Sequence, residues 1–253
     1  MVAKSSVKAG HPAGAAGRPA SSRQRVLPLS LLALTVATGV VDAVSYLVLG
    51  RVFVANMTGN VVLLGFALAG AGGLSAPTSL ASLGSFLVGA VVGGRLAARQ
   101  GGHPGRHLSV GAAVGTVAAA AALALAAVAG WSEAPARYGL IALLAFGMGV
   151  QSATARRLGV PDLSTNVLTM TLTGLAADSP RLSATSRRVG SVLCMLTGAL
   201  LGGLLIRQVS VSAALGLATV LLAGTAATVG RLAVGTPADA WQRPSPPDPP
   251  GRR

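Results

Sequence analysis

Eight apolar segments with almost no charged residues follow one another along this chain of 253 residues. They cover residues 27–49, 52–71, 77–98, 108–130, 137–155, 163–177, 188–206 and 209–232. A helix needs about 20 apolar residues to cross the hydrocarbon core of a bilayer, and most of these segments reach that length. Only 10% of the residues are charged, whereas a soluble domain carries about 25%. The sequence therefore predicts an all-α polytopic membrane protein.

The two ends of the chain have compositions that cannot form a hydrophobic core. Residues 1–26 combine five Lys or Arg residues with Ala, Gly, Ser and Pro, and residues 234–253 are rich in Pro. We expect both stretches to be disordered tails around a transmembrane domain at residues 27–233. The first apolar segment is longer than a signal-peptide core, so we expect it to remain as an anchor.

Composition and motifs argue against nucleic-acid binding, metal binding and catalysis. The net charge is +14, but the basic residues lie in the tails and between apolar segments, without interleaved aromatic residues. His103 and His107 have a metal-like spacing, yet Pro104 and Gly105 should break the helix this requires, so we expect a loop there. The chain has one cysteine, Cys194, and neither a phosphate loop nor a Ser-His-Asp set. We predict no enzyme, no metal and no cofactor.

Two segments carry polar side chains that a helix in hydrocarbon would not leave unpaired. The candidate site residues among them are Asn56, Thr58 and Asn60 in the second segment, and Thr165 and Asn166 in the short sixth segment. If both segments are half-helices that meet, these side chains and the helix N-termini would line a pocket for an anion or carboxylate. The alternative is that Asn and Thr merely cap the half-helices.

An internal repeat relates the two halves of the apolar region. Gly89 and Gly93 lie in the run GAVVGG, which recurs 109 residues later as GALLGG with Gly198 and Gly202. The pair Asn60-Val61 recurs 106 residues later. We therefore predict repeat halves at about residues 27–130 and 137–232. The Gly-xxx-Gly patterns favour close helix packing, either within the chain or in a homodimer.

The distribution of Lys and Arg distinguishes two topologies, because short loops rich in these residues stay cytoplasmic. Eight spanning segments would place 13 of them inside and 7 outside. Six spanning helices plus two short or re-entrant polar half-helices would place 17 inside and 3 outside. We prefer the second arrangement, with both termini cytoplasmic and three spanning helices in each inverted half, and keep eight spanning segments as the alternative.

Asp42 is the one acidic residue deep in an apolar segment, where an acid costs ~2.5–3.5 kcal/mol on insertion scales. It should face the bundle interior, where it could take up a proton or bind a cation. Alternatively, it accepts hydrogen bonds from Asn56, Thr58 or a half-helix N-terminus and locks the fold. Tyr46, one turn later on the same face, could donate to it. Gln151, near the end of the fifth segment, completes the candidate substrate or ion site.

Two runs of residues resemble a known family. They are GVVDAVSYL at residues 39–47 and VFVANMTGNVV at residues 52–62. The sequence is similar here to the YoaK family of uncharacterised bacterial inner-membrane proteins. The family's Gly-x-Gln-Asn helix end and following Thr-rich segment look similar to residues 149–152 and 163–174, although Ser152 replaces the Asn. The resemblance covers about residues 28–232 and implies a bacterial plasma-membrane protein of the permease type with no established activity.

Together these observations predict an integral protein of the bacterial inner membrane that transports a small molecule or ion. The substrate is not identified by the sequence, and Asp42 could couple transport to protons. The alternative is a membrane scaffold or sensor that transports nothing and uses its polar clusters for stability alone. The partners expected are the lipid bilayer and the unknown small molecule or ion, without nucleic acid.

Overall fold

The computed structural model describes residues 22–99, 103–157 and 182–234, and these residues form seven α-helices. The helices are α1 (Ser22–Val48), α2 (Met57–Leu68), α3 (Ala76–Ala98), α4 (Pro104–Ala129), α5 (Ala134–Arg157), α7 (Leu182–Gln208) and α8 (Val211–Ala233). Six of the described helices are long and apolar enough to cross a membrane, and the exception is the 12-residue α2. The chain is thus a polytopic helical membrane protein, as predicted.

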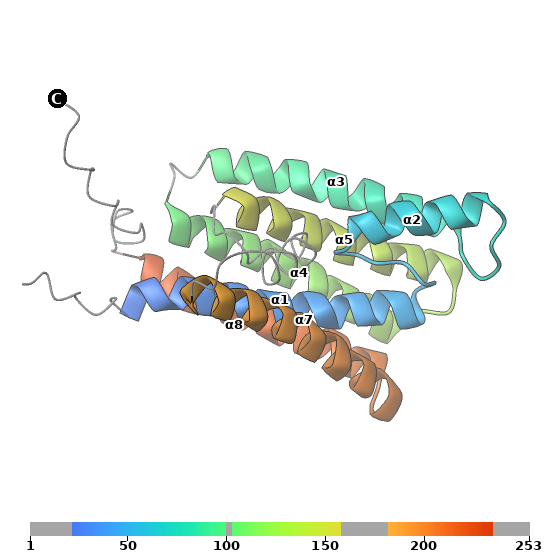
Figure 1. Ribbon diagram of the computed structural model, residues 1–253. Coiled ribbons are helices and arrows are strands. Elements are labelled where there is room, and N and C mark those ends of the chain that lie inside the picture. The colour runs from blue at the N-terminus through green and yellow to red at the C-terminus, as the bar shows by residue number, and fades with distance from the viewer. Residues whose placement is uncertain (1–21, 100–102, 158–181, 235–253) are drawn as a thin grey trace, which may run out of the picture.

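The six long helices run side by side as one bundle, and α2 lies against α3 at one end of it (Figure 1). Helix α1 begins at Ser22, inside the stretch that we expected to be a tail. The predicted half-helix at residues 163–177 lies outside the described residues, as do residues 1–21 and 235–253.

The loop predicted around His103 and His107 is wrong, because Pro104 starts α4 instead of breaking a helix. A proline at the first helical position sacrifices no hydrogen bond, since its missing N–H would have no helical partner. His103 precedes it as the N-cap, and its Nδ1 accepts a hydrogen bond from the Arg106 N–H at 3.3 Å. His107 is buried in the first turn. No three His, Cys, Asp or Glu side chains gather as a metal site anywhere in the described ranges.

Glycines bring two pairs of parallel helices into close contact. In the α3/α5 pair, a Cβ atom added to Gly89 would collide with the carbonyl oxygen of Phe146. In the α1/α7 pair, a Cβ atom added to Gly198 would collide in the same way with the carbonyl oxygen of Val36. Such close approach of backbones is typical of Gly-xxx-Gly packing in membranes.

The two glycine contacts are related by the predicted repeat. In one contact the glycine comes from the first half and its partner from the second half, and in the other contact these roles are exchanged. Gly89 and Gly198 are 109 residues apart, and their partners Val36 and Phe146 are 110 residues apart. One helix turn further on, Gly93 faces Val150 and Gly202 faces Val40, which preserves the same spacings. The inverted repeat stays a prediction, and this exchange of partners supports it.

Both ends of the segment that contains α2 lie at the same end of the bundle (Figure 1). Arg51, just after α1, places its Nη1 atom 3.1 Å from where a Cβ atom of Gly73, just before α3, would be. A Cβ atom on Gly50 would lie 3.8 Å from the Cγ2 atom of Thr78, in the first turn of α3. The chain therefore dips into the bundle after α1 and returns to the same end before α3 begins.

Candidate functional site

An extended stretch without helical hydrogen bonds separates α1 from α2. Gly50 and Arg51 adopt φ angles of 107° and 55° and turn the chain back toward the bundle. Residues 52–56 then run inward before α2 begins at Met57, and Val52 and Val54 are fully buried. Buried backbone groups need hydrogen-bond partners, above all in a membrane, so side chains must provide what a helix would otherwise supply.

Asp42 provides part of this pairing from α1. Its Oδ1 atom accepts hydrogen bonds from the Val54 N–H at 3.0 Å and from the Ala55 N–H at 2.9 Å. The residue is 5% exposed, and its Oδ2 atom is buried without a hydrogen-bond partner. It lies roughly 9 Å inside the end of α1, because six helical residues at about 1.5 Å each separate it from Val48. One carboxylate oxygen thus holds the backbone of Val54 and Ala55, and the other has no hydrogen-bond partner.

Asn60 and Ser82 hold the backbone of Phe53 from the other side. The Asn60 Oδ1 atom accepts from the Phe53 N–H at 2.8 Å, and its Nδ2 donates to the Phe53 carbonyl oxygen at 2.6 Å. Ser82 on α3 donates to the same carbonyl at 2.6 Å and accepts from Asn60 Nδ2 at 3.1 Å. Sequence reasoning missed Ser82, although Thr78 and Ser82 are polar positions one turn apart on the same face of α3 and could have indicated it.

The side chains that we expected to donate to Asp42 have other roles. Asn56 is exposed and caps α2, since its Oδ1 accepts from the Gly59 N–H at 3.4 Å. Thr58 is exposed in the first turn of α2. The ring of Tyr46 stacks on that of Phe53 with centroids 4.9 Å apart, and Tyr46 donates no hydrogen bond to Asp42. Of the alternatives that the sequence left open, the side-chain donors are therefore wrong, and the donors are backbone amides just before the N-terminus of α2, which is close to the expected half-helix N-terminus.

Gln151 reaches α1 from α5, one turn away from Asp42. Its Nε2 atom donates to the Oγ1 atom of Thr38 at 3.2 Å, while its Oε1 atom is buried without a partner. Thr38, which sequence reasoning also missed, lies four residues before Asp42 on the same face of α1. The structure thus brings together Thr38, Asp42 and Gln151. Thr165 and Asn166 lie outside the described residues, so the predicted pocket between two half-helices is not tested.

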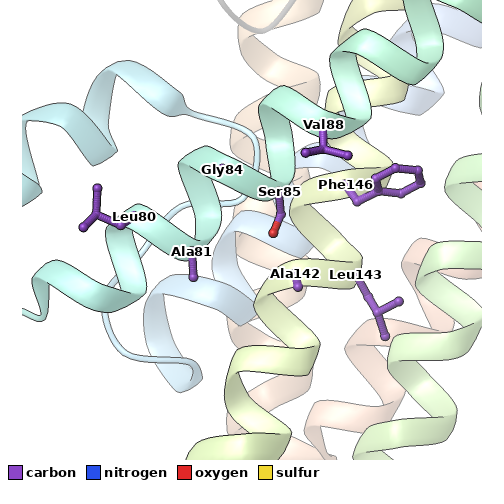
Figure 2. A pocket seen from close by; sticks show the side chains of 8 residues that line it. All are labelled: Leu80, Ala81, Gly84, Ser85, Val88, Ala142, Leu143 and Phe146. Atoms are coloured by element: carbon purple, nitrogen blue, oxygen red, sulfur yellow. The ribbon is translucent and has the colours of Figure 1, made fainter.

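A separate hollow of about 490 Å³ lies between α3 and α5 (Figure 2). It is lined by Leu80, Ala81, Gly84, Ser85, Val88, Ala142, Leu143 and Phe146. Leu80 and Val88 are more than half exposed, and Ser85 is the one polar side chain in the lining. None of the predicted substrate or ion residues lines this hollow, whose surface matches the apolar surroundings of a bundle in a bilayer.

Comparison with known proteins gives a family without an assigned activity. Residues 30–228 match the model of a family described as "Protein of unknown function (DUF1275)". Over 161 residues the chain is 37% identical to the UPF0700 transmembrane protein YoaK of Bacillus subtilis (strain 168). That alignment covers 59% of this chain and 65% of the relative, which is less than two thirds of the relative's length. No solved structure matches the chain.

Proposed function

The chain belongs to the DUF1275 family, which confirms the family predicted from the sequence, and from its polar site we propose that it transports a small molecule or ion across the bacterial inner membrane. Because neither the family description nor the name of the relative mentions a substrate, the proposal rests on the site. We place the transport site at the extended stretch of residues 52–56, beside Asp42. We propose no enzymatic activity.

The observation that carries this proposal is the half-used carboxylate of Asp42. A neutral acceptor would suffice to bind the amides of Val54 and Ala55, and would avoid the cost of an acid in the membrane, about 2.5–3.5 kcal/mol. Acids inside membrane bundles commonly mark ion pathways and proton relays. Transporters commonly bind substrate and coupling ions where a helix is broken near the midplane. Asp42 therefore fits a group that binds and releases a proton or cation during transport.

A second function, that of a membrane scaffold or sensor, is favoured by the hydrogen bonds that this site already makes. Asp42 Oδ1 and the side chain of Asn60 are fully engaged in holding residues 53–55. A bundle that needed only a rigid loop would show the same bonds. The two functions differ in whether the charge of Asp42 matters once these bonds are kept.

Asp42→Asn tests that difference, because the amide oxygen of Asn can still accept from Val54 and Ala55 while the charge is lost. We expect a deletion strain to change its uptake or efflux of at least one compound in a panel of labelled solutes. The wild-type protein should restore the change, and Asp42→Asn should behave as an empty vector at equal abundance in the membrane. Equal restoration by Asp42→Asn and wild type would contradict the transport role of Asp42 and favour the scaffold.

Thr35→Val is the matched control for this experiment. Thr35 is buried in the same helix, and its hydroxyl donates within the helix to the Leu31 carbonyl oxygen at 2.9 Å. Its loss removes a buried polar group from α1 without touching residues 53–55. We expect Thr35→Val to restore the solute change as the wild-type protein does.

Both termini are proposed to face the cytoplasm, because arginines gather at the end of the bundle where α3 stops and α4 starts. Ten arginines of the described helices lie near that end: Arg23, Arg25, Arg95, Arg99, Arg106, Arg156, Arg157, Arg187, Arg188 and Arg231. Three lie near the opposite end: Arg51, Arg137 and Arg207. Short loops rich in Lys and Arg stay in the cytoplasm, so the first end should face inward.

Single cysteines on either side of α3 test this orientation. In a Cys194→Ala background, we expect an impermeant thiol reagent on intact cells to label Ala71→Cys but not Ala98→Cys. Both positions are exposed, and they lie at opposite ends of α3. Disrupted cells should label both positions, which controls for accessibility. Labelling of position 98 alone on intact cells would exclude the proposed orientation.

A further inference from the structure

Two buried acceptor oxygens lack hydrogen-bond donors where α1 and α5 approach each other. They are the Oδ2 atom of Asp42 and the Oε1 atom of Gln151, two of the four buried unpartnered side-chain atoms among the described residues. The other two, His107 Nδ1 and Arg137 Nε, belong to residues near the ends of the bundle. The large majority of buried side-chain polar atoms in proteins have a hydrogen-bond partner, so two unpartnered acceptors on neighbouring helices require an explanation.

Thr38 lies near both residues that carry these oxygens. Gln151 Nε2 donates to Thr38 Oγ1 at 3.2 Å, and the Oε1 atom is bonded to the same carbon as this nitrogen. Thr38 and Asp42 are four residues apart on α1, so their Cβ atoms are about 5–6 Å apart. Gln151 Oε1 therefore lies close to Thr38, one turn of α1 away from the residue that carries the other unpartnered oxygen.

No described side chain neutralises Asp42. Its two hydrogen bonds come from neutral backbone amides, and its second oxygen has no partner. None of the charged and titratable side chains on the described elements around it forms a hydrogen bond or an ion pair with its carboxylate, whose donors are both backbone amides. These side chains are Tyr46, Arg51, Arg137, Tyr138, Arg156, Arg157, Cys194, Arg207 and Arg231. The site thus has one negative charge and two acceptor oxygens.

From this geometry we propose that α1 and α5 bind one monovalent cation between Asp42 Oδ2 and Gln151 Oε1. The inference rests on the proposed transport function and names the coupling ion of the same site. One positive charge matches the single carboxylate, whereas a divalent ion would leave an excess charge in the membrane. A proton on Oδ2 would donate to Gln151 Oε1, and an alkali ion would be held by both oxygens. Either cation would therefore give both acceptor oxygens a partner.

Gln151 supplies the part of the proposed site that lies on α5, so the site lies between two helices and does not consist of Asp42 alone. It belongs to the second predicted half of the chain, and Asp42 belongs to the first. Binding of the cation would join α1 to α5, and its release would leave the two helices connected here by the Gln151–Thr38 hydrogen bond. Transporters with inverted repeats place their coupling ions at such a junction between halves.

The test is the thermal unfolding of purified protein in detergent, with choline chloride replaced stepwise by NaCl or KCl at constant ionic strength, at pH 6 and pH 8. A ligand at a hundredfold excess over its Kd should raise the unfolding temperature of a chain this size by about 5–10 °C. A saturable rise with one alkali salt identifies an alkali ion. A rise on acidification in choline chloride alone identifies a proton, because a proton bound only in the folded state stabilises that state at low pH.

Three variants assign the response to the site. Asp42→Asn should abolish the rise, and Gln151→Leu should abolish it or shift it to at least about tenfold higher ligand concentration, since a leucine offers no oxygen. Gln151→Leu decides the matter even if Asp42→Asn does not fold, because a response that does not involve Gln151 would persist in this variant. Thr35→Val should respond as the wild-type protein does.

The proposal is overturned if neither salt nor acidification shifts the wild-type unfolding temperature, or if Gln151→Leu shifts as much as the wild type. These outcomes are distinct from failure of the transport function. A cation response without any solute phenotype would keep the site and remove the function. A solute phenotype that Asp42→Asn abolishes, without a cation response, would keep the function and remove the site.

Discussion

Leucine in place of Gly89 or Gly198 is expected to leave no folded protein after detergent extraction. At both positions even a Cβ atom would collide with a carbonyl oxygen of the facing helix, Phe146 in one case and Val36 in the other. Backbone atoms cannot rotate away as a side chain could, so the helices must separate and the surrounding contacts are lost. Alanine at either position adds only the Cβ atom, so the helices need to move apart less than for leucine, and we expect it to fold at a cost of about 1–3 kcal/mol, typical of overpacking, with an unfolding temperature lowered by about 2–12 °C.

Gly94→Leu and Gly203→Leu are the matched controls, because each lies on the same helix as one of the tested glycines. A Cβ atom on Gly94 would meet no other residue within 4 Å, and one on Gly203 would meet the Leu47 side chain at 3.8 Å. We expect both variants to elute as the wild type does in size-exclusion chromatography after heating. Equal loss of folded protein in the control and test variants would contradict the claim that these two helix contacts are special.

The membrane fold and the approximate helix ranges could be predicted from the sequence because hydrocarbon imposes simple rules on composition and length. Apolar segments near 20 residues must be helices there, and six of the eight predicted segments correspond to the six long described helices. The ends were less predictable. Pro104 begins α4 rather than breaking it, since the same residue stops a helix from inside and starts one at its first position.

The polar site could be located from the sequence, but its bonds could not. An acid or amide in an apolar segment indicates that a partner must exist, and Asp42, Asn60 and Gln151 stood out for that reason. The partners of Asp42 are the backbone amides of Val54 and Ala55, and every residue except proline carries such an amide. Only the folded path of residues 52–56 selects these two. Thr38 and Ser82 were missed because hydroxyl groups occur in many helices and usually bond within their own helix.

The extended stretch explains why Asn60 is expected to matter more than its exposed neighbour Asn56. Asn60→Leu keeps the volume of the side chain but removes the acceptor for the Phe53 N–H and one of the two donors to the Phe53 carbonyl. A buried N–H without a partner costs about 1–3 kcal/mol, so the unfolding temperature should fall by about 2–12 °C. Asn56→Leu removes a long cap bond of 3.4 Å at an exposed position, and should have a smaller effect.

Combining Asn60→Leu with Asp42→Asn tests whether the two side chains hold residues 53–55 as one unit. Asn60 binds Phe53, and Asp42 binds the next two residues, so a stretch released from one side chain has less to lose from the other. In a double-mutant cycle on the free energy of unfolding, we expect the double variant to lose less than the sum of the single losses, with a coupling of about 0.5–3 kcal/mol. Losses that add within about 0.3–0.5 kcal/mol would mean that the two side chains act on separate structures. Residues 53–55 would then not be held as a single rigid element. The bonds from Asp42 and Asn60 would no longer explain why this stretch lies beside the unpartnered oxygen of Asp42.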